Sequence, residues 1–376
     1  MLLKEFTTYF DGLFCSELAL EWDNVGLIIG NEEKKIKKIL IALDINSNAL
    51  QEALNLNIDL IISHHPLIFK PIKNIVSSNP IGKIILNLIG NDIAVYSAHT
   101  NFDLFKNGIS DYVVKLLNLQ NLENFMPISE KWFKFAIFVP KEFQEKVREA
   151  MCEAGGGKWE DYSCCTFNTE GTGTFKPGES SNPFTGEKGK LSYVDEVKIE
   201  CIISEKKLPY LLKSVLEVHP YEEPAYDIYP LYNKFESGGI GKLGNLLKPL
   251  DEKEFFKFIT SKLRLKNFRY ICNEKNQGNK ILVNKVLLLN GSANSLINEI
   301  LSTNFDALIC GEIDYHNAQI LAEKNRLVVE IGHGESELFF VDIVYNMLIK
   351  FKKNVNPDLK IFKSEQSCNL WRYFFE

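Results

Sequence analysis

The sequence of 376 residues has no hydrophobic run of membrane-spanning length and no closely spaced Cys-x-x-Cys pair. A transmembrane helix needs about 20 apolar residues in succession, so we expect no membrane partner. The eight cysteines are scattered, which favours reduced, mostly buried thiols over a disulfide framework or a thiolate zinc site. Acidic residues occur close to the start of the chain, where a signal peptide would have a basic region followed by an apolar run. We therefore expect a cytoplasmic protein.

An excess of basic residues is also missing. The 43 Lys and Arg residues are outnumbered by 49 Asp and Glu, so a nucleic-acid partner is not expected. No Gly-Lys-Ser/Thr phosphate loop occurs. No Gly-x-Ser-x-Gly elbow occurs either, and its absence argues against a serine hydrolase. Residues 239–244 match the letters of the dinucleotide fingerprint. No strand is predicted before them and Pro249 interrupts the helix that should follow, so we expect them to mark the chain re-entering the core.

Hydrophobic periodicity divides the chain into an N-terminal α/β lobe (1–127), an insert (128–236) and a C-terminal α/β lobe (237–376) that completes the core. Nearly continuous apolar strands separated by helices predict a mostly parallel sheet covered on both faces. The strands are expected at 38–44, 58–62, 93–97, 283–289, 307–310 and 327–331. The helices are expected at 46–57, 81–89, 108–117, 253–263, 295–302, 315–324 and 335–351.

The insert has a different rhythm, β-α-β-β-α-β, which is the ferredoxin-like order of an α+β domain. Its elements are expected at 133–139, 141–153, 159–167, 194–203, 207–218 and 225–231, with residues 171–189 forming an exposed hairpin or loop. The fold class is therefore α/β with an α+β insert. A plain tandem of two domains is disfavoured, because neither flank shows enough strands for an independent six-stranded sheet.

Histidines and carboxylates cluster directly after the predicted strands. His64 and His65 follow strand 58–62, His99 and Asp103 follow strand 93–97, and His333 follows strand 327–331. Ligands of open α/β sheets bind beyond the carboxyl ends of the strands. Because mixed His and carboxylate ligands suit divalent metals, these motifs together favour a two-metal hydrolytic site.

Each motif also has a simpler interpretation. His64 and His65 fit a polar turn before Pro66, and His99 with Asp103 fits a loop hydrogen bond or a cap for the helix from Gly108. Glu337, four residues after His333, fits a partner of the helix dipole. His316 fits either a helix N-terminus capped by Asp314 or a substrate contact, and His219 fits a structural or subunit contact in the insert.

The motifs at residues 22–27, 63–66, 98–103, 311–316 and 332–337, taken in this order, resemble the NIF-three-like family, also known as GTP cyclohydrolase I type 2 homologues. The insert, which ends in the motif at 219–231, looks like the PII/CutA-like domain of the longer bacterial members. The resemblance implies two α/β lobes, a dinuclear metal centre and a toroidal homohexamer.

Carried over by motif, the resemblance implies as metal ligands His64, His65, Asp103, His333 and Glu337. Glu337 is expected to bridge two divalent cations, with His65 and Asp103 on one and His64 and His333 on the other. Zinc, iron or manganese suits this ligand set.

The family's name implies hydrolysis of GTP, a nucleotide, to formate and a dihydropterin triphosphate by metal-activated water. His99 is the candidate proton shuttle, and Glu312 is a weaker catalytic candidate. Two alternatives stay open. One is a different metal-dependent hydrolase such as a phosphoesterase, and the other is a non-enzymatic, metal-binding regulatory scaffold.

Overall fold

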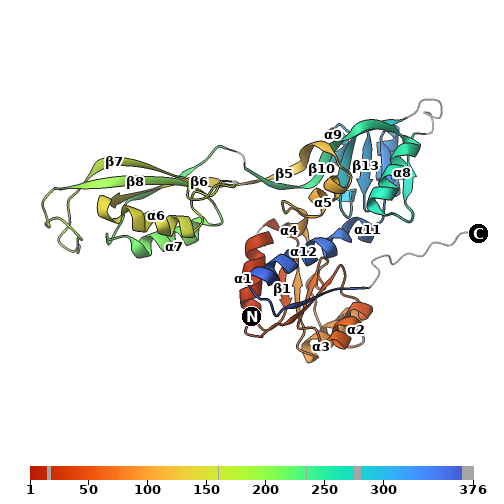
Figure 1. The fold of residues 1–376 in the computed structure, drawn as a ribbon, viewed down its shortest axis with the longest axis horizontal. Helices are drawn as coiled ribbons and strands as arrows, with labels where there is room; N and C mark the ends of the chain where they lie inside the picture. Colours follow the sequence, from red (N-terminus) through yellow and green to blue (C-terminus); the bar gives the residue numbers. More distant parts are fainter. Residues whose placement is uncertain (15–17, 160, 234, 274–280, 366–376) are drawn as a thin grey trace, which may run out of the picture. The chain divides into compact units, whose positions relative to one another are not determined.

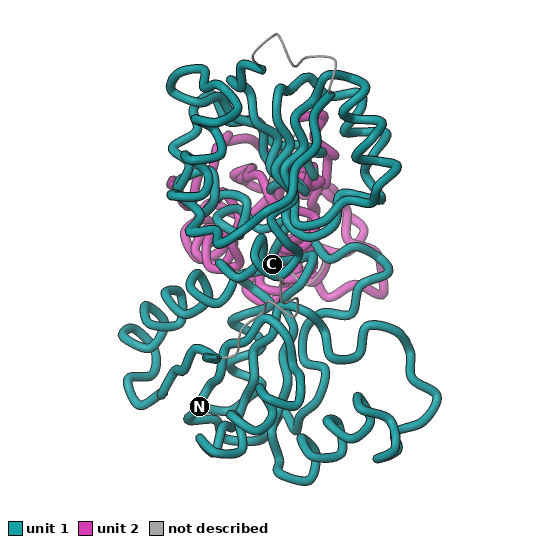
Figure 2. The backbone as a smooth tube through the Cα atoms, turned by 90° about the vertical axis from the view of Figure 1, so that its right-hand side faces the viewer, with its two compact units in different colours: residues 1–128, 237–376 teal, residues 129–236 magenta. Residues whose placement is uncertain are grey.

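The computed structural model describes residues 1–14, 18–159, 161–233, 235–273 and 281–365. The chain forms two compact units: Met1–Ile128 with Ser237–Glu376, and Ser129–Glu236 (Figure 2). In the first unit, segments from both ends of the chain share one hydrophobic core. No helix within the described residues is long and apolar enough to cross a membrane.

The first sheet of the larger unit has five strands in the order β1-β4-β3-β2-β15. Their bounds are Gly26–Ile29 (β1), Lys38–Ala42 (β2), Leu60–Ser63 (β3), Ala94–Ser97 (β4) and Lys360–Lys363 (β15). Strands β4, β3, β2 and β15 run parallel, and β1 is antiparallel to β4. The predicted parallel sheet is thus present, with one antiparallel edge strand.

Side chains of this sheet alternate between two hydrophobic clusters. Ile39, Ile41 and Ile62 belong to one cluster, whereas Leu40 and Ile61 belong to the other. Helices α1 (Leu3–Phe14) and α12 (Phe339–Asn354) contribute to the first cluster, and α2 (Ser47–Leu56) and α3 (Pro80–Gly90) contribute to the second (Figure 1). Burial on both faces explains why these strands read as unbroken apolar runs.

The second sheet of the larger unit has six strands in the order β11-β14-β13-β12-β10-β5. Their bounds are Gln120–Glu130 (β5), Phe235–Asp251 (β10), Arg269–Ile271 (β11), Leu282–Leu289 (β12), Ala307–Cys310 (β13) and Leu327–Glu330 (β14). The central strands β12, β13 and β14 are parallel. Helices α5 (Ile109–Leu116), α8 (Glu252–Leu263), α9 (Ile297–Ser302) and α10 (Tyr315–Glu323) accompany them, as do the short helices α4 (Thr100–Asp103) and α11 (His333–Glu337).

Each of the two sheets contains strands from both sides of the insert. Strand β5 precedes the insert but belongs to the second sheet, and β15 near the end of the chain completes the first. A six-stranded sheet therefore exists, although neither flank supplies it alone. The glycine-rich residues 239–244 lie inside β10, where Gly241 pairs with Leu289, so they form no phosphate loop.

One predicted helix, at 335–351, is two helices in the structure. Helix α11 ends at Glu337 and α12 begins at Phe339. The predicted helix 295–302 likewise begins with a 3-10 turn, Asn294–Leu296, before α9. Local periodicity does not reveal either break, and the one between α11 and α12 comes directly after Glu337.

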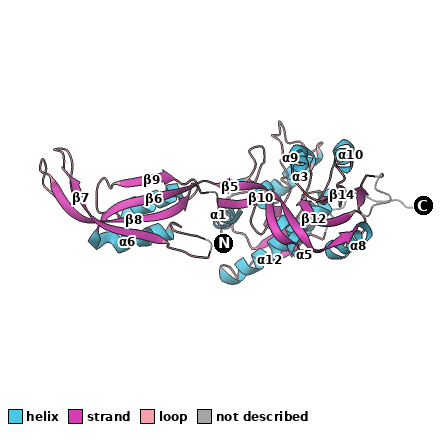
Figure 3. Cartoon of the chain, turned by 90° about the horizontal axis from the view of Figure 1, so that it is seen from above, coloured by secondary structure: helices cyan, strands magenta, loops and turns pink. Residues whose placement is uncertain are grey.

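The smaller unit contains β6 (Trp132–Pro140), α6 (Gln144–Glu153), β7 (Thr166–Phe175), β8 (Ser192–Ser204), α7 (Leu208–Val218) and β9 (Tyr226–Pro230). Its antiparallel sheet has the order β7-β8-β6-β9 (Figure 3), and α6 and α7 lie side by side on one face (Figure 1). The predicted β-α-β-β-α-β succession is present. Strand β7 begins at Thr166 instead of residue 159, because Trp159 and Tyr162 pair with each other in an isolated bridge and Cys164, just before the strand, has a positive φ of 57°.

The expectation of reduced cysteines is wrong for one pair. Cys152 at the end of α6 and Cys164 are joined by a disulfide, with their Cα atoms 5.0 Å apart. Cys201 and Cys310 are free and buried, in agreement with the expectation, whereas free Cys165 is exposed. The turn at residues 155–157 brings the bonded pair together, and cysteine spacing alone does not predict it.

Candidate metal centre

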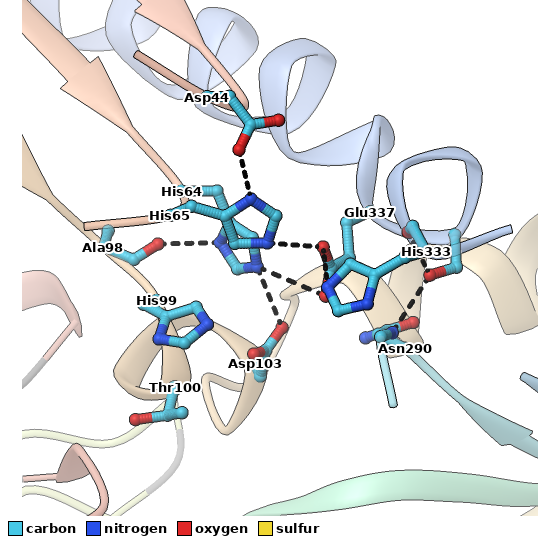
Figure 4. A network of polar contacts seen from close by, with 12 residues as sticks. Asp44, His64, His65, Ala98, His99, Thr100, Asp103, Asn290, His333 and Glu337 are labelled. Atoms are coloured by element: carbon cyan, nitrogen blue, oxygen red, sulfur yellow. Dashed lines mark hydrogen bonds and ion pairs between the residues drawn. The ribbon is translucent and has the colours of Figure 1, made fainter. Parts of the chain in front are cut away.

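The predicted motifs converge at the carboxyl ends of parallel strands in the larger unit (Figure 4). Strand β3 is followed by His64 and His65, β4 by His99 and Asp103, and β14 by His333. Helix α11 then adds Glu337. All five predicted ligands and both predicted catalytic residues therefore lie in one neighbourhood.

His64 is fully buried, and its orientation is fixed from one side. Its Nδ1 lies 2.8 Å from the Ala98 carbonyl oxygen, to which it donates a hydrogen bond. Its Nε2 lies 3.7 Å from Asp103 Oδ1 and 3.8 Å from Glu337 Oε1. Because the proton is held at Nδ1, the Nε2 lone pair is directed toward the two carboxylates.

His65 is held in the same way by a carboxylate. Its Nδ1 lies 2.7 Å from Asp44 Oδ1, and its Nε2 lies 2.9 Å from Glu337 Oε2. A carboxylate behind an imidazole fixes the tautomer and increases the basicity of the opposite nitrogen, an arrangement common among metal-ligating histidines. Asp44 follows β2 at the same edge of the sheet, and the sequence prediction missed it.

His333 and Glu337 lie four residues apart on α11, so one turn brings them together. His333 Nε2 lies 3.3 Å from Glu337 Oε2, and its Nδ1 lies 3.3 Å from Glu312 Oε2. Glu312 therefore contacts the far side of His333. Gly291 makes room for the Glu337 carboxylate, because a Cβ at Gly291 would lie 2.5 Å from Glu337 Oε1.

His99 is oriented by Asp23, a second residue that the sequence prediction missed. The His99 Nδ1 lies 2.8 Å from Asp23 Oδ1, and the Thr100 amide and hydroxyl donate to Asp23 Oδ2. Burial favours the neutral carboxyl, but the hydrogen bonds from His99 and Thr100 lower the Asp23 pKa to about 2. One ring nitrogen each of His64, His65 and His99 lies within 4.8 Å of the others, close enough for His99 to be a ligand.

The centre is arranged to hold positive charge. Burial opposes protonation of His65, yet contacts with Asp44 and Glu337 raise its pKa to about 10. Burial likewise opposes ionisation of Glu337, but the three surrounding histidines hold its pKa well below the usual range. Burial raises the pKa of Asp103. Without a cation, protons on the imidazoles balance the carboxylates.

Several ligand-type atoms of the centre are buried and make no hydrogen bond of normal geometry. They are His64 Nε2, Asp103 Oδ1, and the pair His65 Nε2 and Glu337 Oε2, which face each other at 2.9 Å. Buried polar atoms are normally satisfied, so four such atoms converging on one place fit a cation that would accept their lone pairs. His64 Nε2 lies 3.7 Å from Asp103 Oδ1, and the ring centroids of His65 and His333 lie 5.3 Å apart, which favours these two pairs. The pairing expected from the resemblance, His65 with Asp103 and His64 with His333, is not tested by these contacts.

The other two histidines lie apart from this centre. His316 is exposed beside Tyr315, and Asp314 caps α10 as one of the two interpretations requires. His219 is buried in the smaller unit, where its ring contacts the Phe138 carbonyl and accepts from the Tyr221 amide. His219 therefore has a structural role in that unit.

The fold and the centre together define an α/β protein with a cluster of histidines and carboxylates suited to a divalent metal. The chain belongs to the Duf34/NIF3 (NGG1p interacting factor 3) family, which matches residues 1–369. It is 37% identical over 322 residues to a Halalkalibacterium halodurans protein named GTP cyclohydrolase 1 type 2 homolog, and the matched residues cover 85% of each chain. A Bacillus subtilis relative of the same name is 35% identical and covers 93% of each chain.

Solved structures agree with this assignment. The crystal structure of a Bacillus cereus protein related to NIF3 matches with a TM-score of 0.89 and 35% identity, covering 100% of this chain and 99% of that chain. A Staphylococcus aureus protein matches with a TM-score of 0.76 and 25% identity over the same shares. The family resemblance derived from the sequence motifs is thus confirmed.

Proposed function

We propose that the centre binds two divalent metal ions, with His64, His65, Asp103, His333 and Glu337 as ligands. The four converging, buried ligand-type atoms that make no hydrogen bond of normal geometry carry this proposal. Glu337 would contribute to both ions, because its Oε1 lies 3.8 Å from His64 Nε2 while its Oε2 lies 2.9 Å from His65 Nε2 and 3.3 Å from His333 Nε2. Zinc, iron or manganese suits three imidazoles with two carboxylates.

When bound, two such ions lower the pKa of a coordinated water and polarise the substrate. His99 then serves as the proton shuttle, because Asp23 holds its Nδ1 and leaves Nε2 to accept and return a proton. The Glu312 carboxylate contacts His333 Nδ1 and so orients the His333 ring, which makes Glu312 a positioning residue. If His99 is a shuttle, His99→Gln retains both metals and loses turnover. If His99 is a ligand, the same variant loses metal.

An aromatic pair beside His99 favours a substrate with a planar ring. Trp22 and Phe69 are 57% and 44% exposed, and their ring centroids lie 5.6 Å apart. The centroids lie 6.2 Å and 6.3 Å from the His99 ring. The Asn24 side chain donates to the Ile68 carbonyl, which ties the two loops together. Stacking on exposed aromatic rings is a common way to bind a nucleobase, at about 1–3 kcal/mol per base.

These observations, with the names of the relatives, lead us to propose GTP as the substrate. Water adds at C8 of the guanine imidazole ring, which opens to a formamide, and a second water hydrolyses the formamide to release formate. The freed amine then condenses with the rearranged ribose, with loss of one water, to give a dihydropterin triphosphate. Trp22 and Phe69 stack on the base, and His99 accepts the proton of the attacking water. A phosphoester substrate without a base would leave the aromatic pair unused.

Metal-loaded protein incubated with GTP tests the proposal through formate release and pterin fluorescence. We expect both products from the wild type, neither from His65→Ala, and a raised KM from Trp22→Leu. Protein that holds two metals per chain but gives no formate contradicts the proposed reaction. Phosphate release from simple phosphoesters would then indicate a phosphoesterase. No turnover of either substrate class would favour the regulatory scaffold.

Two expectations from the family resemblance stay predictions. The insert is proposed to be PII/CutA-like, which its β-α-β-β-α-β succession and the strand order β7-β8-β6-β9 support. The chain is proposed to assemble as a homohexamer. Native mass spectrometry of the full chain tests this assembly, and a mass other than six copies at micromolar concentration contradicts it.

A further inference from the structure

The smaller unit contains a cavity of about 630 Å³ that has no part in the metal centre. The loop between β7 and β8 forms one wall, and the segment around Tyr221 forms another. Aromatic rings line it: Tyr221 lies 6.0 Å from Phe175 and 6.2 Å from Phe184, measured between ring centroids. Phe138 contributes a further ring. The volume lies within the range of small-molecule sites, about 300–1,000 Å³.

The charge of this lining has one sign. Glu196, Glu222 and Glu223 line the cavity, and no lysine or arginine is among its described lining residues. Glu196 accepts a hydrogen bond of 2.8 Å from the Tyr221 hydroxyl. Glu222 accepts one of 2.9 Å from the Asn182 amide, which ties the β7–β8 loop to the opposite wall. None of the three glutamates forms an ion pair with another described residue of the chain.

Glu196 is positioned through Gly173 on the neighbouring strand. Gly173 lies on β7 and Glu196 on β8, and a Cβ at Gly173 would overlap the Glu196 carboxylate. The missing side chain therefore lets this carboxylate lie across β7 at the cavity wall. The structure thus places a carboxylate without a cationic partner in the wall of a cavity that is also lined by Phe138, Phe175, Phe184 and Tyr221.

Two ligand classes do not match this lining. A bound metal ion needs ligand atoms that converge, and the three glutamates form no such group, in contrast to the described histidine clusters. A phosphate or another anion would meet three carboxylates and no basic lining group, which is repulsive. A positive charge attached to an apolar body satisfies both the carboxylates and the rings, since aromatic faces attract cations.

We propose that this cavity binds a small organic cation, an amine or a quaternary ammonium compound. Its charge lies beside Glu196, and its carbon skeleton packs against Phe175, Phe184 and Tyr221. Binding is independent of the metal centre, because every lining residue belongs to the smaller unit.

Isothermal titration of the full chain with choline and with spermidine tests this proposal, with ATP as the anionic comparison. Glu196→Gln removes the charge with little change in shape, and Gly173→Ala displaces the carboxylate without removing it. Glu187→Gln is the matched control, because Glu187 is in the same loop but pairs with Lys190 outside the cavity lining. Circular dichroism and thermal melting establish that each variant is folded.

We expect saturable binding of at least one cation by the wild type and by Glu187→Gln. Affinity should fall about 10-fold or more in Glu196→Gln, and several-fold in Phe184→Leu, since a cation–π contact contributes about 2- to 30-fold. Gly173→Ala should bind more weakly although its charge is unchanged. The proposal is overturned if the wild type binds neither cation at millimolar concentration, if it binds ATP in their place, or if Glu196→Gln binds as tightly as Glu187→Gln.

Discussion

Asp44 offers a sharp test of the metal centre, because it contacts a proposed ligand without being one. Its Oδ1 lies 2.7 Å from His65 Nδ1, on the side of the ring opposite Glu337. Asp44→Asn keeps the shape of the side chain and an oxygen that can accept the same hydrogen bond. It removes the negative charge that makes His65 Nε2 a stronger donor to a metal.

The expected magnitude follows from this contact. Loss of a hydrogen-bonding partner behind a metal-ligating histidine typically lowers metal affinity about 10- to 100-fold, or about 1.4–2.7 kcal/mol. We expect Asp44→Asn to lie near 10-fold, since the amide oxygen still orients the ring. Asp44→Ala should lie nearer 100-fold. In the metal-free protein, the pKa of His65 should fall from about 10, because the Asp44 contact raises it.

Competition with a chromogenic chelator gives the metal affinities, and NMR titration gives the His65 pKa. Asp92→Asn is the control, because Asp92 is a 74% exposed carboxylate that pairs with Lys34 away from the centre. We expect wild-type affinity in this variant. If Asp44→Asn and Asp92→Asn bind metal equally well, Asp44 does not support the centre and His65 is not a ligand.

Three further predictions follow from the same contacts. Gly291→Ala should lower the metal content measured by elemental analysis, because φ is +57° at Gly291 and the added Cβ would crowd Glu337. Gly12→Ala is the control and should leave the metal content unchanged, because no atom lies within 4 Å of its added Cβ. Phe340→Ala should cost about 3–5 kcal/mol in urea unfolding, because this fully buried ring lies 4.9 Å from His64, and a loss below 1 kcal/mol would refute the packing. In the metal-free protein the folded-state pKa of His65 is raised from 6.5 to about 10. Protonated His65 therefore adds to the free energy of unfolding in full below pH 6.5, and this contribution is lost as the pH rises toward 10. Denaturation curves should show this loss without metal and little of it with metal bound, and equal pH dependence in both forms would contradict it.

The buried parallel strands were predictable because their apolar runs are continuous and are separated by helical periods. Strand β10 was not predicted, because its glycines have low strand propensity. Its position depends on close approach between backbones: a Cβ at Gly241 would lie 2.5 Å from the Leu288 carbonyl oxygen. The pairing of Lys360 with Lys38 in the first sheet joins distant parts of the sequence, so local patterns carry no information about it.

The residues of the centre were largely predictable from one rule, the position after the carboxyl end of a parallel strand. Asp44 lay inside the predicted strand 38–44, whereas β2 ends at Ala42, so the same rule would have found Asp44 only with the correct end of that strand. Asp23 lies inside the family motif at 22–27, but it follows no predicted strand and its partner, His99, comes from a different element, so its contact with the centre was not predicted. The pairing of ligands depends on how α11 approaches β3, which is a tertiary property.

An anomalous-scattering map of metal-loaded crystals, combined with elemental analysis, tests the central proposal most directly. We predict two metal ions per chain, both bridged by Glu337, with His64 and Asp103 on one ion and His65 and His333 on the other. His65→Ala should lose at least one of them. An ordered metal at any other set of residues, or a metal-replete crystal with no ion at Glu337, would contradict this account.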